Sequence, residues 1–129
     1  MLESMYASAN YQASKALLDL TAQRHQALTG NLANVDTPGY RRKDVDPSFR
    51  AELEKSLQAG DVEAIRRTGT PEIREEGGGK ATRPDGNNVS LDRELMLINQ
   101  NALEYEALTQ FVSSSLDRMK LAITGRNSG

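Results

Sequence analysis

Residues 91–125 read LDRELMLINQNALEYEALTQFVSSSLDRMKLAITG, and their apolar side chains recur at alternating spacings of three and four residues. This spacing places them along one side of an α-helix, and its regularity is typical of the a and d positions of a heptad repeat. Ser90 is a suitable N-cap and Gly125 a suitable helix end. We name this row the C-terminal seam; it comprises Leu95, Ile98, Ala102, Tyr105, Thr109, Val112, Leu116, Met119 and Ile123.

The N-terminal quarter of the chain predicts a second long helix. Residues 2–35 contain no proline, and their apolar residues also recur every three or four positions. Pro38 disfavours the helical conformation at Thr37, and Pro38 with Gly39 suits the two central positions of a type II turn. We therefore expect the helix to end near residue 35. Its apolar side includes Leu17, Leu20, Leu28 and Leu32.

The middle of the chain is charged and rich in turn-forming residues. Residues 36–90 carry 21 of the 34 charges. Asp46 and Pro47 resemble an N-cap followed by the first helical residue, and Gly60 is a natural stop, so a short helix over 47–59 is predicted. The glycine run at 77–79 has too few apolar neighbours to fix its own structure, and we expect it to be mobile unless a partner holds it.

These patterns predict an all-α fold in which two long terminal helices pack as an antiparallel hairpin or coiled coil. In this interpretation residues 1–35 and 89–124 form one helical domain, and residues 36–88 connect them. Off the apolar rows, both helices carry mostly Asn, Gln, Ser and Thr where a solvated helix usually carries Lys, Glu and Arg. Such surfaces suit burial against other subunits, although the solvated side of a marginal helix is the alternative.

Composition argues against several classes of function. The chain has 129 residues and a net charge of -2, which does not favour binding to nucleic acid or to an anionic membrane. It has no cysteine and one histidine, His25, so the usual zinc sites are excluded. No nucleophile with a base partner can be picked out, so we expect no enzyme activity and no cofactor or metal. Residues 41–43 are basic, but Asp44 and Asp46 follow, which indicates a solvated loop with local ion pairs.

No apolar run approaches the roughly 20 residues that span a bilayer. The first twenty residues also lack a basic segment followed by a continuous apolar one. We therefore expect no cleavable secretory signal, and either a cytoplasmic location or export by another route.

Two stretches carry a family resemblance. NLANVDTPGY, residues 31–40, resembles the N-terminal signature of the bacterial flagellar rod and hook proteins. RPDGNNVSLDRE, residues 83–94, is similar to the stretch that opens the C-terminal helix of a short proximal rod subunit in that family. The matching positions are Asn31, Leu32, Ala33, Asn34, Thr37, Pro38, Gly39, Tyr40, Asp85, Gly86, Asn87, Asn88 and Val89.

The resemblance implies a structural subunit of the flagellar basal body proximal rod, which self-assembles through its terminal helices into the drive shaft needed for motility. It implies export by the flagellar type III apparatus without a cleavable signal, and a place in the rod that spans the periplasm. The implied partners are copies of the chain, other rod subunits, and proteins of the MS-ring junction and export gate. Another short rod subunit, or a helical-hairpin adaptor or export chaperone that binds a partner helix, is the alternative.

The matching residues are expected to take part in subunit packing. A helix stop followed by a turn would by itself explain Pro38 and Gly39. It does not explain why Asn31 and Asn34 frame the last turn of the predicted helix.

Overall fold

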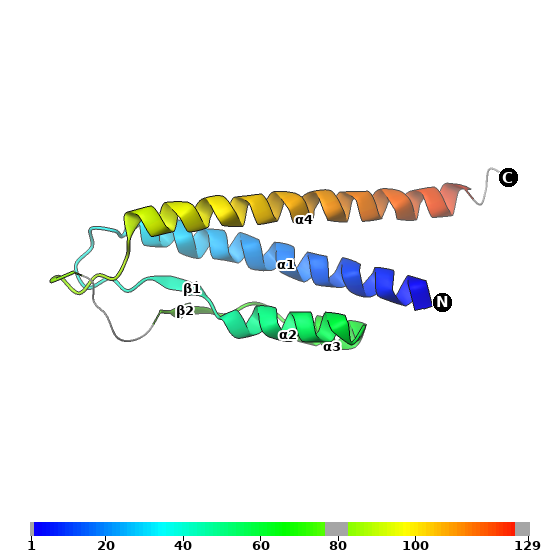
Figure 1. The fold of residues 1–129 in the computed structure, drawn as a ribbon, viewed down its shortest axis with the longest axis horizontal. Coiled ribbons are helices and arrows are strands. Elements are labelled where there is room, and N and C mark those ends of the chain that lie inside the picture. Colours follow the sequence, from blue (N-terminus) through cyan, green and yellow to red (C-terminus); the bar gives the residue numbers. More distant parts are fainter. Residues whose placement is uncertain (1, 77–82, 126–129) are drawn as a thin grey trace.

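The computed structural model describes residues 2–76 and 83–125, and two long helices dominate it (Figure 1). Helix α1 spans Leu2–Ala33 and helix α4 spans Leu91–Gly125. They lie side by side and run in opposite directions, and the short helices α2 (Pro47–Gln58) and α3 (Val62–Arg67) lie on the other side of α1. The predicted all-α class is confirmed, and so is the packing of the N-terminal helix against the C-terminal one.

Helix α1 ends close to the predicted position. Its last residue is Ala33, two residues before the expected end at Val35. The chain then turns: Gly39 has a φ of 75°, and the Tyr40 amide donates to the Thr37 carbonyl at 3.2 Å. A positive φ at the third position together with this hydrogen bond is characteristic of a type II turn, so the predicted turn is confirmed.

The short helix predicted over 47–59 is confirmed as α2. The Asp46 side chain accepts a hydrogen bond from the Ser48 amide at 2.9 Å, and Pro47 occupies the start of the helix. Gly60, with a φ of 66°, follows the helix end. The start and stop residues in the sequence therefore act as expected.

Three short elements of the middle region were not predicted. Helix α3 is capped by Asp61, whose side chain accepts from the Ala64 amide at 3.0 Å. Strands β1 (Lys43–Val45) and β2 (Ile73–Glu75) pair antiparallel, with Asp44 opposite Arg74. Each element is too short to produce a periodic pattern. The glycine run at 77–79 lies outside the described residues.

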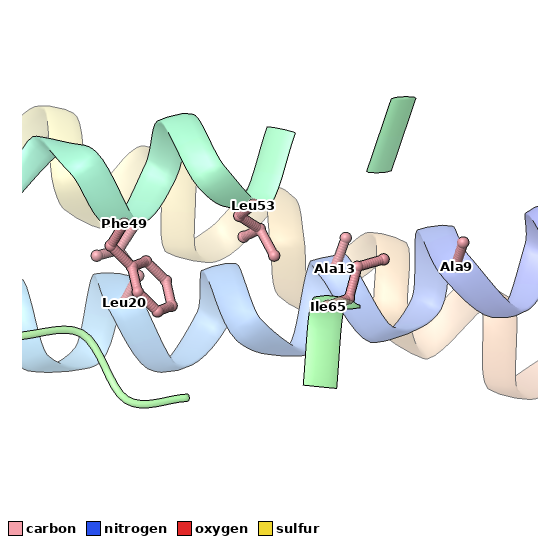
Figure 2. Close-up of a cluster of buried hydrophobic side chains, with 6 residues drawn as sticks. All are labelled: Ala9, Ala13, Leu20, Phe49, Leu53 and Ile65. Carbon is pink, nitrogen blue, oxygen red and sulfur yellow. The ribbon is translucent and has the colours of Figure 1, made fainter. Parts of the chain in front are cut away.

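A small apolar core joins α1 to the two short helices (Figure 2). Ala9, Ala13 and Leu20 of α1 are buried against Phe49 and Leu53 of α2 and Ile65 of α3. The alanines on α1 leave room for the larger side chains of α2 and α3. This core uses one side of α1 and no residue of α4.

The contact between α1 and α4 lies on another side of α1 and is polar at its most buried points. Asn101 of α4 is 2% exposed, and its amide nitrogen donates to the Thr21 carbonyl of α1 at 2.7 Å. Toward the C-terminal end of α4 the two helices separate (Figure 1). There Leu121 and Ile123 are each 69% exposed. Among the described residues, no helix is long and apolar enough to cross a membrane.

We expect Leu53→Ala to lower the free energy of unfolding by about 2–4 kcal/mol, because it leaves a cavity in the core between α1 and α2. Leu121→Ala, which removes the same atoms from an exposed site, should change the free energy by less than about 0.5 kcal/mol. Urea denaturation of the purified chain, followed by far-UV circular dichroism, measures both. Equal losses in the two variants would contradict this description of the core.

Candidate functional site

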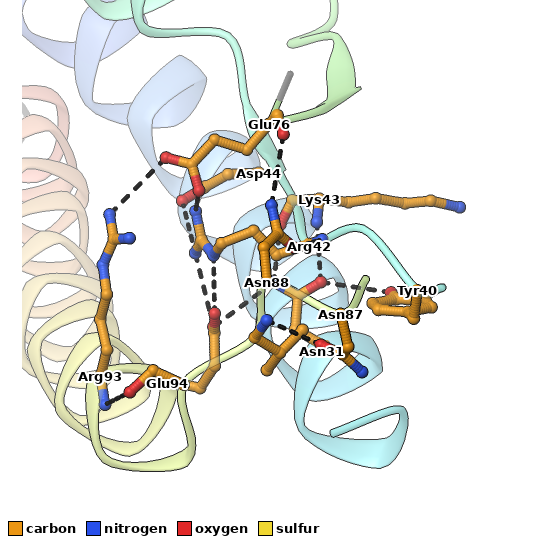
Figure 3. Close-up of polar contacts among 12 residues, drawn as sticks. Asn31, Tyr40, Arg42, Lys43, Asp44, Glu76, Asn87, Asn88, Arg93 and Glu94 are labelled. Carbon is orange, nitrogen blue, oxygen red and sulfur yellow. Dashed lines mark hydrogen bonds and ion pairs between the residues drawn. The ribbon is translucent and has the colours of Figure 1, made fainter. Parts of the chain in front are cut away.

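A buried polar cluster lies where α1 ends and α4 begins (Figure 3). At its centre is Arg42, which is 1% exposed. Its Nε donates to Glu94 Oε1 at 2.7 Å, its Nη1 to Glu76 Oε2 at 2.7 Å, and its Nη2 to Asp44 Oδ2 at 3.2 Å. We call Arg42, Asp44, Glu76, Glu94 and Asn31 the Arg42 cluster. It joins α1, the strand pair and the first turn of α4.

The interpretation of residues 41–43 as a solvated loop is wrong for Arg42. The local pair with Asp44 is present, but the strongest partner is Glu94, 52 residues away in sequence and fully buried. Two opposite charges can leave water together when their hydrogen bonds are satisfied. The fold therefore buries a residue that the sequence pattern places on the surface.

The pKa values of two members of the cluster, Arg42 and Asp44, are shifted by their surroundings. Burial alone lowers the pKa of Arg42, but hydrogen bonds to Glu94 and Glu76 and their charges outweigh burial and raise this pKa above its ordinary value. Burial likewise raises the pKa of Asp44, but the hydrogen bonds from Arg24 and the Val45 amide, with the nearby positive charges, lower it overall. Both shifts favour the charged forms of Arg42 and Asp44.

The Asn31 side chain links α1 to β1 by making the pair of backbone hydrogen bonds that a neighbouring strand would make. Its Nδ2 donates to the Lys43 carbonyl at 2.7 Å, and its Oδ1 accepts from the Lys43 amide at 2.8 Å. The Tyr40 hydroxyl also donates to this oxygen, at 3.2 Å, and Glu94 Oε2 lies 3.4 Å from Nδ2. The buried amide is therefore satisfied at both ends, as a buried polar side chain requires.

The Asn87 side chain also contacts backbone groups, here the carbonyls just after the end of α1. It is fully buried, and its Nδ2 lies 3.0 Å from the Asn34 carbonyl, 3.2 Å from that of Val35 and 2.8 Å from that of Thr37. These three carbonyls belong to the turn that follows α1, and the Asn34 carbonyl also accepts from the Thr37 amide at 3.1 Å. Asn87 supplies a donor from the segment before α4, and Arg83 also donates to the Val35 carbonyl.

The two turns that carry the resemblance pack on each other. The Gly39 amide donates to the Asp85 carbonyl at 2.9 Å, and the Arg42 amide donates to Asn88 Oδ1 at 2.6 Å. Gly86, with a φ of 84°, brings its backbone so near Gly39 that an added Cβ would lie 3.6 Å from the Gly39 Cα. The structure therefore brings together the two stretches of the family resemblance, 31–40 and 85–89, within one chain.

The remaining matching residues differ in burial. Val89 is buried, Leu32 is half-buried and Ala33 is exposed. Thr37 and Pro38 are exposed at the tip of the turn. Part of the matching stretch thus serves the fold, and part lies on the surface.

The C-terminal seam lies mostly in water in the isolated chain. Leu95, Tyr105, Leu116, Met119 and Ile123 are exposed apolar residues, and Ala102 is exposed as well. Ile98 and Val112 are half-buried. The buried side of α4 is instead centred on a neighbouring row of buried and half-buried residues, which comprises Glu94, Leu97, Asn101, Glu104, Leu108, Val112 and Ser115.

On α1, the residues assigned to the apolar side are less exposed. Leu20 and Leu28 are buried, and Leu17 and Leu32 are half-buried. Leu20 and Leu17 pack with α2 and α3. The two predicted rows are therefore not arranged as one continuous apolar interface between α1 and α4.

Sequence reasoning missed Arg42, Glu76, Glu94 and Asn101. Glu94 and Asn101 are seven residues apart on the buried side of α4, so a search for polar residues in heptad register would have found them. Nothing in the local sequence pairs Arg42 with Glu94. No group of His, Asp and Glu within the described part of the chain is arranged to hold a metal ion.

Comparison with known proteins decides the family. No protein-family model matches the chain. The chain is 32% identical over 142 residues to the flagellar basal body rod protein FlgB of Escherichia coli strain K12. The matched region covers 98% of this chain and 100% of that protein. The chain is also 34% identical over 117 residues to FlgB of Aquifex aeolicus strain VF5, covering 87% of this chain and 90% of the relative. The chain belongs to the FlgB family of flagellar basal body rod proteins.

FlgB of Bacillus subtilis strain 168 is a more distant relative, 29% identical over 111 residues that cover 79% of this chain and 83% of the relative. The FlgB relatives confirm the interpretation as a structural subunit of the proximal rod and not an enzyme. Nothing in them favours a rod subunit of the FlgC type, an adaptor or an export chaperone.

We expect Arg42→Met to lower the free energy of unfolding by about 3–5 kcal/mol, because it leaves Glu94 buried without a counter-charge. Adding Glu94→Gln should recover part of this loss, since no charge then stays buried and unpaired. Arg41→Met, at the adjacent half-buried position, should cost less than about 1 kcal/mol. Urea denaturation measures all three, and an Arg42 variant as stable as the Arg41 variant would contradict the assignment.

The lowered pKa of Asp44 predicts a loss of stability in acid. The folded chain binds this proton more weakly than the unfolded chain, so the stabilisation is complete above the unfolded pKa of about 4 and is lost as the pH falls through the lower folded pKa. Asp44→Asn should therefore flatten the fall in unfolding free energy below about pH 4. Asp36→Asn, at an exposed site, controls for the loss of one negative charge. An unchanged slope in Asp44→Asn would contradict the prediction.

Proposed function

We propose that this FlgB-family chain assembles into the rod through the exposed sides of its two long helices. In the assembled rod, the C-terminal seam packs against helices of neighbouring subunits in coiled-coil fashion. The observation that carries the proposal is the exposed apolar seam of α4. A chain of this size that works alone rarely leaves so many large apolar side chains in one row in water.

The described part of the chain leaves much of the seam uncovered. One side of α1 is occupied by α2 and α3, and the side that meets α4 does so through the row of Glu94, Asn101 and Leu108. Leu116 is 42% exposed although it belongs to the most regular apolar row of the sequence. Burying this apolar row between subunits therefore contributes a favourable free energy to assembly.

We infer that residues 1–35 and 89–124 form the assembling domain, and that residues 36–88 are held on it as a connecting region. The Arg42 cluster supports this division, because it fixes both ends of the connecting region to the long helices. Thr37 and Pro38 are exposed members of the matching stretch, in the turn that follows α1, and α1 stops at one end of the molecule (Figure 1). We infer that they contact the next subunit along the rod.

The partners and the location follow from the family resemblance. We infer that the neighbours are copies of this chain and other rod subunits, and that proteins of the MS-ring junction and the export gate meet it at the rod base. We also infer that it reaches the periplasm-spanning rod through the flagellar type III apparatus. The absence of cysteine is consistent with passage as an unfolded chain, since no disulfide has to form or break.

We expect Leu116→Asp to abolish swimming, because it would place an unpaired charge inside the packed seam. Leu116 suits this test better than Ile98 or Val112, which are half-buried within the chain, so that a charge there would also destabilise the monomer. The matched control is Ile73→Asp, at an exposed apolar residue of β2.

The measurement is swimming in soft agar, together with the amount of the protein in isolated basal bodies, in cells that lack their own copy of the gene. The urea midpoint of purified Leu116→Asp should match that of the unmodified chain. Normal swimming of Leu116→Asp cells would contradict the proposal that the seam is a subunit interface.

A further inference from the structure

The two buried residues of α4, among those that the structure describes, are both polar. Glu94 is fully buried, and Asn101, seven residues further along the helix, is 2% exposed. The large apolar residues of α4 are half-buried or exposed instead, and Leu95, next to Glu94, is 43% exposed. We call the row of buried and half-buried residues that contains Glu94 and Asn101 the inner row. A helix packed for stability alone would bury its most apolar side.

Asn101 contacts α1 through one hydrogen bond. Its Nδ2 donates to the Thr21 carbonyl at 2.7 Å, whereas its Oδ1 is buried and accepts from no described residue. The Thr21 hydroxyl is not its donor, because this hydroxyl donates to the Leu18 carbonyl of its own helix at 2.8 Å. A buried amide side chain is less favourable than an apolar one of the same shape unless its hydrogen bonds are all made. Stability therefore does not explain an asparagine at this position.

The seam begins one position beyond each of these two polar residues. Leu95 follows Glu94 and Ala102 follows Asn101, and each residue turns an α-helix by about 100°. A rotation of α4 by about this angle would bring the seam onto α1 and carry Asn101 away from Thr21. The hydrophobic effect favours the rotated position, because the seam carries more apolar surface than the inner row. The two polar residues oppose it, since both would lose their partners.

Glu94 and Asn101 hold α4 in different ways. The shortest hydrogen bond of Glu94 is to Arg42, which lies before β1 and not on α1. Asn101 lies about 10 Å further along α4, at 1.5 Å per residue. Its hydrogen bond goes directly to the α1 backbone. In coiled coils, a single buried asparagine fixes the alignment and the partner of a helix at a cost in stability.

We propose that Asn101 determines which side of α4 packs on α1, and that it thereby keeps the C-terminal seam free for neighbouring subunits. Asn101 is then a specificity-determining residue for assembly. With an apolar residue at this position, α1 can cover either the inner row or the seam, and a chain that covers its own seam is lost to assembly. The inference rests on the proposed function, because it takes the seam as the surface that assembly uses.

Asn101→Leu tests the proposal in the purified chain, because leucine has nearly the shape of asparagine but makes no side-chain hydrogen bond. Two single-cysteine probes report which side of α4 is covered, since the chain contains no cysteine. Thr109→Cys probes the exposed seam, and Ser115→Cys probes the half-buried inner row. Each probe is placed in the unmodified chain and in Asn101→Leu, and its rate of reaction with a maleimide is measured in the absence of urea.

In the unmodified chain, we expect the seam probe to react faster than the inner-row probe. In Asn101→Leu, we expect the seam probe to slow and the inner-row probe to accelerate, while the urea midpoint stays the same or rises. A residue that only stabilises the fold would instead lower the midpoint and accelerate both probes. Unchanged rates, or acceleration at both probes, would overturn the proposal.

The matched control is Asn99→Leu, which makes the same exchange at an exposed position of α4 and should leave both probe rates unchanged. In cells that lack their own copy of the gene, we expect Asn101→Leu to be lost from isolated basal bodies and Asn99→Leu to be retained. Equal amounts of the two variants there would overturn the proposal. Asn101→Ala, which removes the amide without adding bulk, replaces Asn101→Leu if the leucine variant does not fold, with the same expected rates.

The probe rates are measured on the monomer, so their outcome is separate from that of the proposed function. Normal swimming of Leu116→Asp cells would contradict the seam as a subunit interface. If Leu116→Asp abolishes swimming but Asn101→Leu leaves both probe rates unchanged, the proposed function stands and the role of Asn101 is overturned.

Discussion

The buried ion pair between Arg42 and Glu94 constrains the rest of the structure. A guanidinium and a carboxylate taken out of water are tolerated only while they face each other with their hydrogen bonds made. Arg42 precedes β1 and Glu94 lies in the first turn of α4, so this pair sets where α4 begins relative to the end of α1. Asn31 completes the arrangement by bonding both Lys43 backbone groups and approaching Glu94. These contacts therefore fix the direction in which α4 runs relative to α1.

The isolated chain distributes its polar and apolar groups unlike a protein that works alone. Polar side chains such as Arg42, Asn87 and Asn101 are buried between its elements, while much of α4 presents large apolar side chains to water. The apolar core is small and holds α2 and α3 to one side of α1. Polar contacts therefore fix the shape of the monomer, and the hydrophobic effect remains available for contacts between subunits. That division suits a rod protein, which must keep one shape and still bind its neighbours.

The residues that carry the family resemblance have a physical explanation inside one chain. Asn31 and Asn87 satisfy backbone groups at the junction of the two long helices, and Gly39 and Gly86 adopt the positive φ angles of the two turns. A different side chain at either asparagine would leave a buried carbonyl without its donor. Residues other than glycine rarely adopt the φ angles of Gly39 and Gly86. Several residues of the resemblance thus hold the junction of the two long helices together.

The two long helices, the turn at Pro38 and Gly39 and the short helix that begins at Pro47 could be predicted from the amino-acid sequence, because each depends on spacing or on local start and stop residues. The family could be predicted as well, because its motifs are contiguous stretches of the chain. The pairing of Arg42 with Glu94 became visible only in the folded chain, as did the contact of Asn101, one position before the seam residue Ala102, with α1. The same holds for the exposure of much of the seam to water. Periodicity shows that residues share a side of a helix but does not show what that side meets. Contacts between residues 50 or more positions apart depend on packing, which no local pattern records.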